Sequence, residues 1–183
     1  MKKIILISGG QRSGKSSYAE SLALSMSEHP IYVATARVWD KEFASRIQKH
    51  KDARGPMWVN IEEEKQLSNI SLPSSNNLDA KNIIVIDCVT LWATNFYYDT
   101  INNPINIDYS VKEILEKIKE EFNAFTSKYA TFIFVTNEIG LGGVSPNKAQ
   151  REFTDILGWL NQYIASKADE VVLMISGIPV KIK

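Results

Sequence analysis

The chain has 183 residues, 44% of them hydrophobic, and its 21 basic and 21 acidic residues give a formal net charge of zero. This length fits one domain over residues 1–183, and the zero charge argues against nucleic acid or an anionic membrane as partner. Cys88 is the only cysteine, which excludes an internal disulfide. With no signal-peptide pattern and no apolar run near the ~20 residues of a membrane span, we expect a cytoplasmic protein without an integral membrane segment.

Five short apolar runs, rich in β-branched residues, alternate with longer segments of helical pattern. The runs are residues 4–7, 31–34, 83–86, 132–135 and 171–175, and the helical segments are roughly 15–28, 41–51, 109–128 and 148–166. This alternation predicts an α/β fold with a mostly parallel sheet and helices on both faces. Residues 179–183 alternate in polarity and are expected to add a short edge strand.

A glycine-rich turn follows the first apolar run. It reads Gly9-Gly10-Gln11-Arg12-Ser13-Gly14-Lys15-Ser16, which is a complete G-x-x-x-x-G-K-[ST] phosphate loop, and a helical pattern comes next. In such a loop, backbone N–H groups bind phosphate oxygens, the lysine reaches the β- and γ-phosphates, and the hydroxyl ligates Mg²⁺. A plain glycine turn leaves Lys15 and Ser16 unexplained. We therefore predict a nucleoside triphosphate site at these eight residues, with Lys15 catalytic and Ser16 a metal ligand.

Asp87 closes the apolar run 83–86. A phosphate loop needs an acidic partner on another strand to hold Mg²⁺ through water, and the carboxyl end of a parallel strand is where open α/β sheets bind ligands. The alternative is that Asp87 caps a helix beginning at Val89 or Thr90. We favour the metal role because the loop requires it.

A basic segment follows the second apolar run. If residues 41–54 are helical, Arg46, His50 and Arg54 share one face at i, i+4 and i+8. Two neighbouring guanidiniums lower the pKa of an imidazole, which leaves a neutral nitrogen suited to attack on a nucleotide phosphorus. The alternative is a solvated basic face, because lysines occur there too, and spacing alone favours this alternative.

Residues 60–63 read Asn-Ile-Glu-Glu. An asparagine followed three positions later by glutamate is typical of a helix N-terminus, with Asn60 as the N-cap and Glu63 its reciprocal partner. On this interpretation Glu63 is structural and Glu62 is the freer carboxylate.

Another glycine-rich segment, residues 137–143, follows the fourth apolar run. We expect a mobile loop near the phosphates, in which Glu138 orients a substrate hydroxyl or a Mg²⁺-bound water. The alternative is a simple helix-entry loop.

Taken together, three blocks resemble the bifunctional adenosylcobinamide kinase/adenosylcobinamide-phosphate guanylyltransferases of cobalamin biosynthesis. They are the phosphate loop, the block Arg46-Ile47-Gln48-Lys49-His50-Lys51-Asp52-Ala53-Arg54, and the block Val135-Thr136-Asn137-Glu138-Ile139-Gly140. The resemblance runs from residue 4 to the last residue.

This resemblance implies a single-domain, RecA-like P-loop NTPase fold and two reactions. ATP or GTP phosphorylates adenosylcobinamide, and GTP then guanylylates adenosylcobinamide phosphate, with Mg²⁺ present and GMP carried on His50. The nucleotide contacts that it implies are Gly9, Gly10, Gln11, Arg12, Ser13, Gly14, Lys15, Ser16, Ala34, Thr35, Ala36, Lys51, Asp52, Ala53, Arg54, Glu62 and Asp87. It also implies a homo-oligomer, a trimer.

Two other functions are compatible with a phosphate loop. One is a small-molecule kinase that lacks the transferase step and forms no GMP intermediate. The other is a RecA-like assembly ATPase, which hydrolyses ATP with no corrinoid present, although the zero net charge counts against versions that handle DNA.

Overall fold

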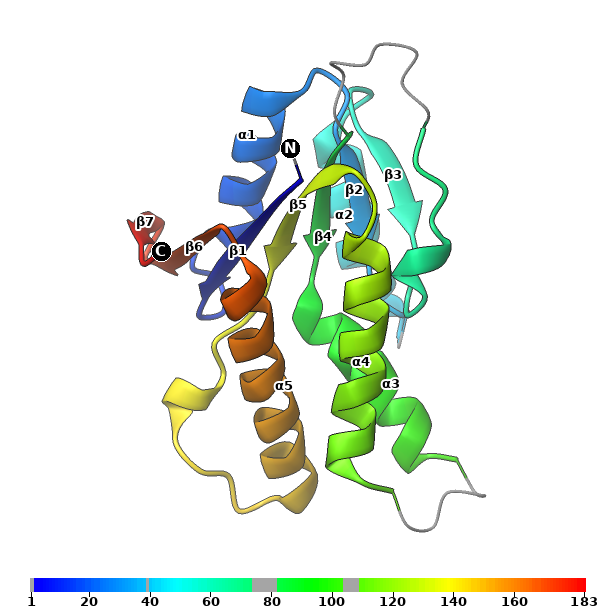
Figure 1. The fold of residues 1–183 in the computed structure, drawn as a ribbon, viewed down its shortest axis with the longest axis vertical. Coiled ribbons are helices and arrows are strands. Elements are labelled where there is room, and N and C mark those ends of the chain that lie inside the picture. The colour runs from blue at the N-terminus through cyan, green and yellow to red at the C-terminus, as the bar shows by residue number, and fades with distance from the viewer. Residues whose placement is uncertain (1, 39, 74–81, 104–108) are drawn as a thin grey trace.

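A seven-stranded sheet forms the centre of the fold, with helices on both faces (Figure 1). The computed structural model describes residues 2–38, 40–73, 82–103 and 109–183. The side chains at positions 43, 46, 49, 50 and 53 also lie outside the described part.

The strand order is β3-β2-β4-β5-β1-β6-β7. The strands are β1 (Lys3–Gly9), β2 (Ile31–Ala34), β3 (Val59–Glu62), β4 (Asn82–Asp87), β5 (Ala130–Val135), β6 (Glu170–Ile175) and β7 (Ile178–Lys181). The α-helices are α1 (Lys15–Met26), α2 (Lys41–Arg54), α3 (Val89–Ile101), α4 (Val111–Thr126) and α5 (Lys148–Lys167), with 3₁₀ turns η1 (Leu67–Asn69) and η2 (Gly140–Gly142). Strands β1 to β6 run parallel, and β7 pairs antiparallel with β6. The predicted α/β fold with a mostly parallel sheet is confirmed, as is the edge strand at the C-terminus.

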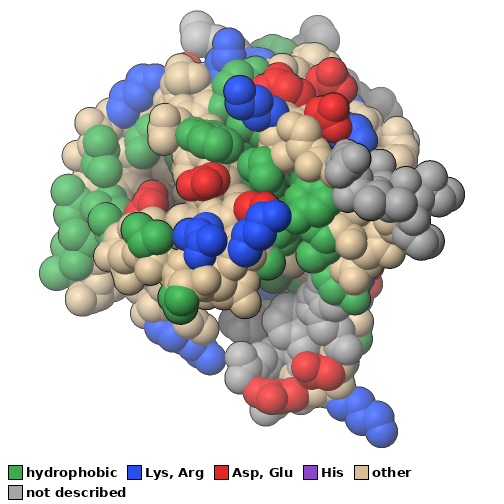
Figure 2. All heavy atoms as spheres, turned by 90° about the horizontal axis from the view of Figure 1, so that it is seen from below, with side chains coloured by type: hydrophobic (Ala, Val, Ile, Leu, Met, Phe, Trp, Pro, Cys, Tyr) green, Lys and Arg blue, Asp and Glu red, His purple; other side chains and the backbone are tan. Residues whose placement is uncertain are grey.

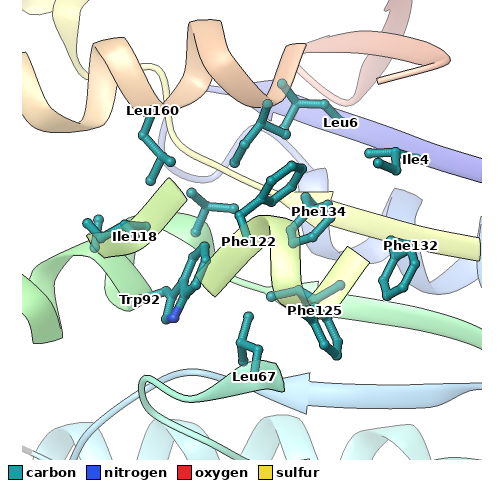
Figure 3. Packing of buried hydrophobic residues seen from close by; sticks show 14 of the residues in the cluster. Ile4, Leu6, Leu67, Trp92, Ile118, Phe122, Phe125, Phe132, Phe134 and Leu160 are labelled. Carbon is teal, nitrogen blue, oxygen red and sulfur yellow. The ribbon is translucent and has the colours of Figure 1, made fainter. Parts of the chain in front are cut away.

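Side-chain alternation along the strands divides the core between the two faces of the sheet. In β1, Ile4 and Leu6 face α3, α4 and α5, whereas Ile5 and Ile7 face α1. The larger core holds four phenylalanines, and Figure 3 shows them between the sheet and the helices that cover it. Because both faces are covered, the central strands read as continuous apolar runs.

The prediction of a helix N-terminus at residues 60–63 is wrong. Asn60, Ile61 and Glu62 belong to β3, which pairs in parallel with β2 at the edge of the sheet. An edge strand is covered less than a central one, so Val59 is 42% exposed and polar residues are tolerated between apolar ones. Glu63 is structural in another way, because its carboxylate accepts the backbone N–H groups of Lys65 and Gln66 ahead of η1.

The structure refines two predicted helix boundaries, the end of α2 and the start of α3. Helix α2 continues to Arg54 instead of ending near residue 51, so the condition under which positions 46, 50 and 54 share a face is met. Helix α3 is capped by Cys88, whose sulfur accepts the N–H of Leu91, and not by Asp87. Within the described residues, every helix is too short or too polar to cross a membrane.

Candidate nucleotide-binding site

A cavity of about 490 Å³ opens at the carboxyl ends of β1, β2, β4 and β5. Figure 2 views the molecule from the side toward which these strands point, where acidic and basic side chains lie close together near the middle of the face. The cavity is lined by Gln11, Arg12, Gly14, Lys15, Ser16, Ser17, Tyr32, Ala34, Ala36, Ile47, Arg54, Asp87, Cys88, Leu91, Val135 and Asn137. The carboxyl edge of a parallel sheet is the usual place for a ligand site in an α/β fold.

The phosphate loop has the predicted context of strand, turn and helix. It leaves β1 at Gly9, and α1 begins at Lys15 with Gly14 as its N-cap in the left-handed conformation (φ 90°). Two backbone hydrogen bonds hold the turn, from the N–H of Ser13 to the carbonyl of Gly10 and from the N–H of Gly177 to the carbonyl of Ser13. The first N–H groups of α1 therefore face the cavity edge, where phosphate oxygens bind in proteins of this type.

Lys15 is a buried cation, with 8% of its surface exposed. Its ammonium group donates a hydrogen bond to the carbonyl oxygen of Gly10 at 2.6 Å. Burial lowers the pKa of Lys15, and the negative charge of Asp87 acts in the opposite direction. A partly desolvated ammonium beside a carboxylate is suited to bind phosphate, because the low local dielectric strengthens its attraction for an anion.

Asp87 ends β4 and lines the same cavity as Ser16. Its Oδ2 accepts a hydrogen bond of 2.8 Å from the hydroxyl of Tyr32. Among the described residues, no group of three or more His, Cys, Asp and Glu side chains could hold a metal ion. One hydroxyl and one carboxylate beside a phosphate loop nevertheless fit Mg²⁺, which keeps several waters and takes further oxygens from substrate phosphates.

Arg54, the last residue of α2, is fixed by three neighbours. Its Cζ lies 3.6 Å from the centre of the Tyr32 ring, and its Nε donates to Oδ1 of Asn60 at 2.9 Å. Its Nη1 lies 3.9 Å from Oε1 of Glu20 in α1, and only 5% of the side chain is exposed. The same side chain lines the cavity, so it presents positive charge there in a fixed orientation.

Several residues of the predicted nucleotide contact set lie outside the cavity lining. Thr35 is fully buried, and its hydroxyl donates to the carbonyl of Cys88 and accepts the N–H of the same residue. Lys51 and Glu62 form an exposed ion pair of 2.9 Å, and Asp52 accepts a hydrogen bond from Gln48. Among the other residues of the set whose side chains the structure describes, those outside the lining are Gly9, Gly10 and Ser13, which belong to the phosphate loop itself.

The predicted nucleophile, His50, belongs to α2, but its side chain lies outside the described part of the structure. The same is true of the side chains of Arg46 and Ala53. Ile47 and Arg54, three residues before and four residues after position 50, both line the cavity.

Sequence reasoning missed Tyr32 and Leu91 as cavity residues and assigned Asn137 only to a loop. The N–H of Asn137 donates to Oγ1 of Thr90, and its carbonyl accepts from Asn161 in α5. The next N–H, that of Glu138, donates to the carbonyl of Gly9, which ties the start of the glycine-rich segment 137–143 to the phosphate loop. The only available signal was position: Tyr32 lies on β2, Asn137 follows β5, and Leu91 lies in the first turn of α3, the helix that follows β4.

The chain is similar to known proteins over nearly its whole length. The sequence model of the family described as cobinamide kinase / cobinamide phosphate guanyltransferase matches residues 5–182. The bifunctional adenosylcobalamin biosynthesis protein CobU of Salmonella typhimurium is 39% identical, over 98% of this chain and 99% of its own. The protein of the same name from Escherichia coli K12 is 36% identical over the same shares. Among solved structures, the flagellar accessory protein FlaH from Methanocaldococcus jannaschii aligns with 100% of this chain and 78% of its own, at 14% identity and a TM-score of 0.46. With a sequence match that covers nearly the whole chain, the protein belongs to the cobinamide kinase / cobinamide phosphate guanyltransferase family.

Proposed function

We propose that the protein phosphorylates adenosylcobinamide and then transfers GMP from GTP to the adenosylcobinamide phosphate, in cobalamin biosynthesis. ATP or GTP serves as the phosphoryl donor, and GTP serves as the guanylyl donor. Family membership supports the pair of reactions, and the cavity beside the phosphate loop supports the use of a nucleoside triphosphate.

One observation supports His50 as the nucleophile. Positions 47, 50 and 54 of an α-helix follow the i, i+3, i+7 pattern of one face. Ile47 and Arg54 line the cavity, so the face of α2 that includes position 50 borders it. The solvated basic face is the weaker explanation, because Arg54 is almost fully buried.

In the kinase reaction, the hydroxyl oxygen of the aminopropanol group attacks the γ-phosphorus. The bond from that phosphorus to the β-phosphate oxygen breaks, the nucleoside diphosphate leaves, and the hydroxyl proton is released to water. Lys15 and the N–H groups of the phosphate loop stabilise the charge on the β- and γ-phosphates. Ser16 and Asp87 would hold Mg²⁺, which neutralises phosphate charge when bound.

In the transferase reaction, the neutral imidazole nitrogen of His50 attacks the α-phosphorus of GTP. A P–N bond forms and pyrophosphate leaves, so GMP remains on the histidine. A phosphate oxygen of adenosylcobinamide phosphate then attacks the same phosphorus. The P–N bond breaks, adenosyl-GDP-cobinamide forms and the imidazole is free again.

The test is incubation with Mg²⁺ and GTP labelled at the α-phosphate. We expect the protein to retain label that is labile to acid and stable to base, and His50→Ala to retain none. The sequence has two histidines, so His29→Ala, in an exposed turn, is the matched control and should label fully. Full labelling of His50→Ala would remove that residue from the mechanism.

Two further assays, of adenosylcobinamide phosphorylation and of ATP hydrolysis, separate the alternatives. A kinase without the transferase step phosphorylates adenosylcobinamide but takes up no label from GTP. An assembly ATPase hydrolyses ATP at full rate with no corrinoid present, whereas we expect little hydrolysis until the acceptor is added.

A further inference from the structure

Tyr32 lies between the two parts of the site that the reactions use. It is paired in register with Val85 of β4, and both side chains belong to the core on the α1 face of the sheet. Because side chains alternate along a strand, Asp87 points to that same face two residues beyond Val85. A tyrosine is long enough to reach this diagonal neighbour, and its hydroxyl donates to Oδ2 of Asp87 at 2.8 Å.

The ring of Tyr32 is held firmly in place. Only 6% of the residue is exposed, and the ring packs edge-on against Trp58 with 5.8 Å between centroids and 85° between planes. The packed ring holds the hydroxyl at the carboxylate of Asp87, to which it donates a hydrogen bond.

The ring of Tyr32 also contacts Arg54 at the end of helix α2. The Arg54 guanidinium stacks on the Tyr32 ring at 3.6 Å, a geometry in which the positive charge is attracted by the face of the ring. Asn60 and Glu20 hold the same guanidinium from β3 and α1. The end of α2 is thus attached to the sheet at the residue that also contacts Asp87.

We propose that Tyr32 is a positioning residue that couples the metal-site carboxylate to the helix of the nucleophile. Its hydroxyl fixes the orientation of Asp87, and its ring seats Arg54 and with it the end of α2. The first half needs only the phosphate loop and Asp87, whereas the second half rests on the proposed role of His50.

Two substitutions separate these roles. Tyr32→Phe removes the hydrogen bond to Asp87 and keeps the ring under Arg54. Tyr32→Leu removes both. The matched control is Tyr109→Phe, which deletes a hydrogen bond of 2.7 Å from a tyrosine to the carboxylate of Glu152, away from the cavity lining.

The hydroxyl is tested by GDP binding, measured by calorimetry in Mg²⁺ and again in EDTA. We expect Tyr32→Phe to reduce the Mg²⁺-dependent gain in GDP affinity about three- to tenfold, the range for losing one hydrogen bond of ordinary strength. Affinity in EDTA should stay at the wild-type value, and Tyr109→Phe should match wild type in both. An unchanged Mg²⁺ gain in Tyr32→Phe would overturn the link to Asp87.

The ring is tested by the initial rate of GMP labelling from saturating GTP and Mg²⁺. We expect Tyr32→Leu to label at least about tenfold more slowly than Tyr32→Phe, because Arg54 loses its stacking partner. Asn60→Ala removes the hydrogen bond that holds Arg54 from β3. This variant should slow labelling and leave the Mg²⁺-dependent gain in GDP affinity unchanged. It also provides the test if Tyr32→Leu does not fold. The link to α2 would be overturned if Tyr32→Phe, Tyr32→Leu, Asn60→Ala and wild type all labelled at the same rate.

A wild-type protein that takes up no label contradicts the proposed function instead. In that case the GDP measurement still decides the role of the Tyr32 hydroxyl.

Discussion

Gly9 and Gly10 begin the phosphate loop under different steric conditions, although both are glycines of one motif. Gly9 has φ 153°, and a Cβ atom there would lie 2.5 Å from the carbonyl oxygen of Met174 and 2.8 Å from Oγ of Ser13. A Cβ atom on Gly10 would have nothing within 4 Å. The close approach of β6 to the loop therefore requires glycine at the first position and not at the second.

We expect Gly9→Ala to lower the free energy of unfolding by about 1–3 kcal/mol, the usual cost of overpacking, and to weaken nucleotide binding. Gly10→Ala should change the free energy of unfolding by less than about 0.5 kcal/mol, as for an exposed substitution. Urea unfolding of both variants checks this. Equal effects of the two substitutions would show that the contact with Met174 is not what selects glycine.

An ion-pair network fastens the segment after β2 to helix α3. Two nitrogens of Arg37 donate to the two carboxylate oxygens of Asp99 at 2.6 and 3.1 Å, and its Nε donates to Glu64 at 2.6 Å. Lys65 adds a hydrogen bond to Asp99 at 2.9 Å. Ala36, next to Arg37, lines the cavity, so the network supports one wall of the site.

The network predicts a pH dependence of stability. The hydrogen bond from Arg37 is the largest cause that lowers the pKa of Asp99, from 3.8 to about 2. The ionised carboxylate therefore stabilises the fold above pH 3.8, and this contribution is lost as the pH falls through about 2. Since the side chains are partly exposed, solvent screening reduces the contribution to about 1 kcal/mol.

We expect Asp99→Asn to be less stable than wild type by about 1 kcal/mol at neutral pH and equal to it below the lowered pKa. Urea unfolding as a function of pH measures both. Glu116→Gln, which removes an exposed pair with Lys119, is the control and should change stability by less than about 0.5 kcal/mol. A difference between Asp99→Asn and wild type that persists at the lowest pH would contradict the assignment.

The elements that were predicted correctly from the sequence are those with a strong local pattern. The five apolar runs all form strands, and most of their side chains are buried. The helical segments at 109–128 and 148–166 carry an apolar stripe that faces the core. β3 was missed because it lies at the sheet edge, where Asn60 and Glu62 are tolerated and imitate a capping box. Its identity depends on pairing with β2, which no local pattern encodes.

Parts of the candidate site could likewise be proposed from the sequence. The phosphate loop and Asp87 could be proposed because their expected chemistry depends on residue type at fixed spacing or at a strand end. Tyr32 could not be predicted as a site residue, because its contact depends on the strand order. That order places β2 beside β4 and so brings the Tyr32 hydroxyl to the carboxylate of Asp87. Contacts between strands that are distant in sequence decide such roles.

At the scale of the whole molecule, exposed aliphatic side chains gather at one edge of the sheet. They belong to β6, β7 and the last residues, and are Ile175, Ile178, Val180 and Ile182. Hydrophobic side chains collect along the corresponding left edge of Figure 2. Contiguous exposed apolar surface on a folded protein is typical of a region that another chain covers.

This surface agrees with the homo-oligomer that the family resemblance implies. We expect light scattering after size exclusion to give three times the chain mass of 20.6 kDa. Recovery of the protein at the mass of one chain, at micromolar concentration, would contradict this expectation.

We propose that GMP is transferred within one cavity, from GTP bound at the phosphate loop to His50 and then to the corrinoid. The decisive measurement is mass spectrometry of the intact protein after incubation with GTP and Mg²⁺, followed by a chase with adenosylcobinamide phosphate. We predict an added mass of one GMP, mapped to residue 50 in peptides prepared at alkaline pH, that disappears on the chase as adenosyl-GDP-cobinamide forms. An adduct on another residue, an adduct that survives the chase, or product formed with no adduct in His50→Ala would contradict it.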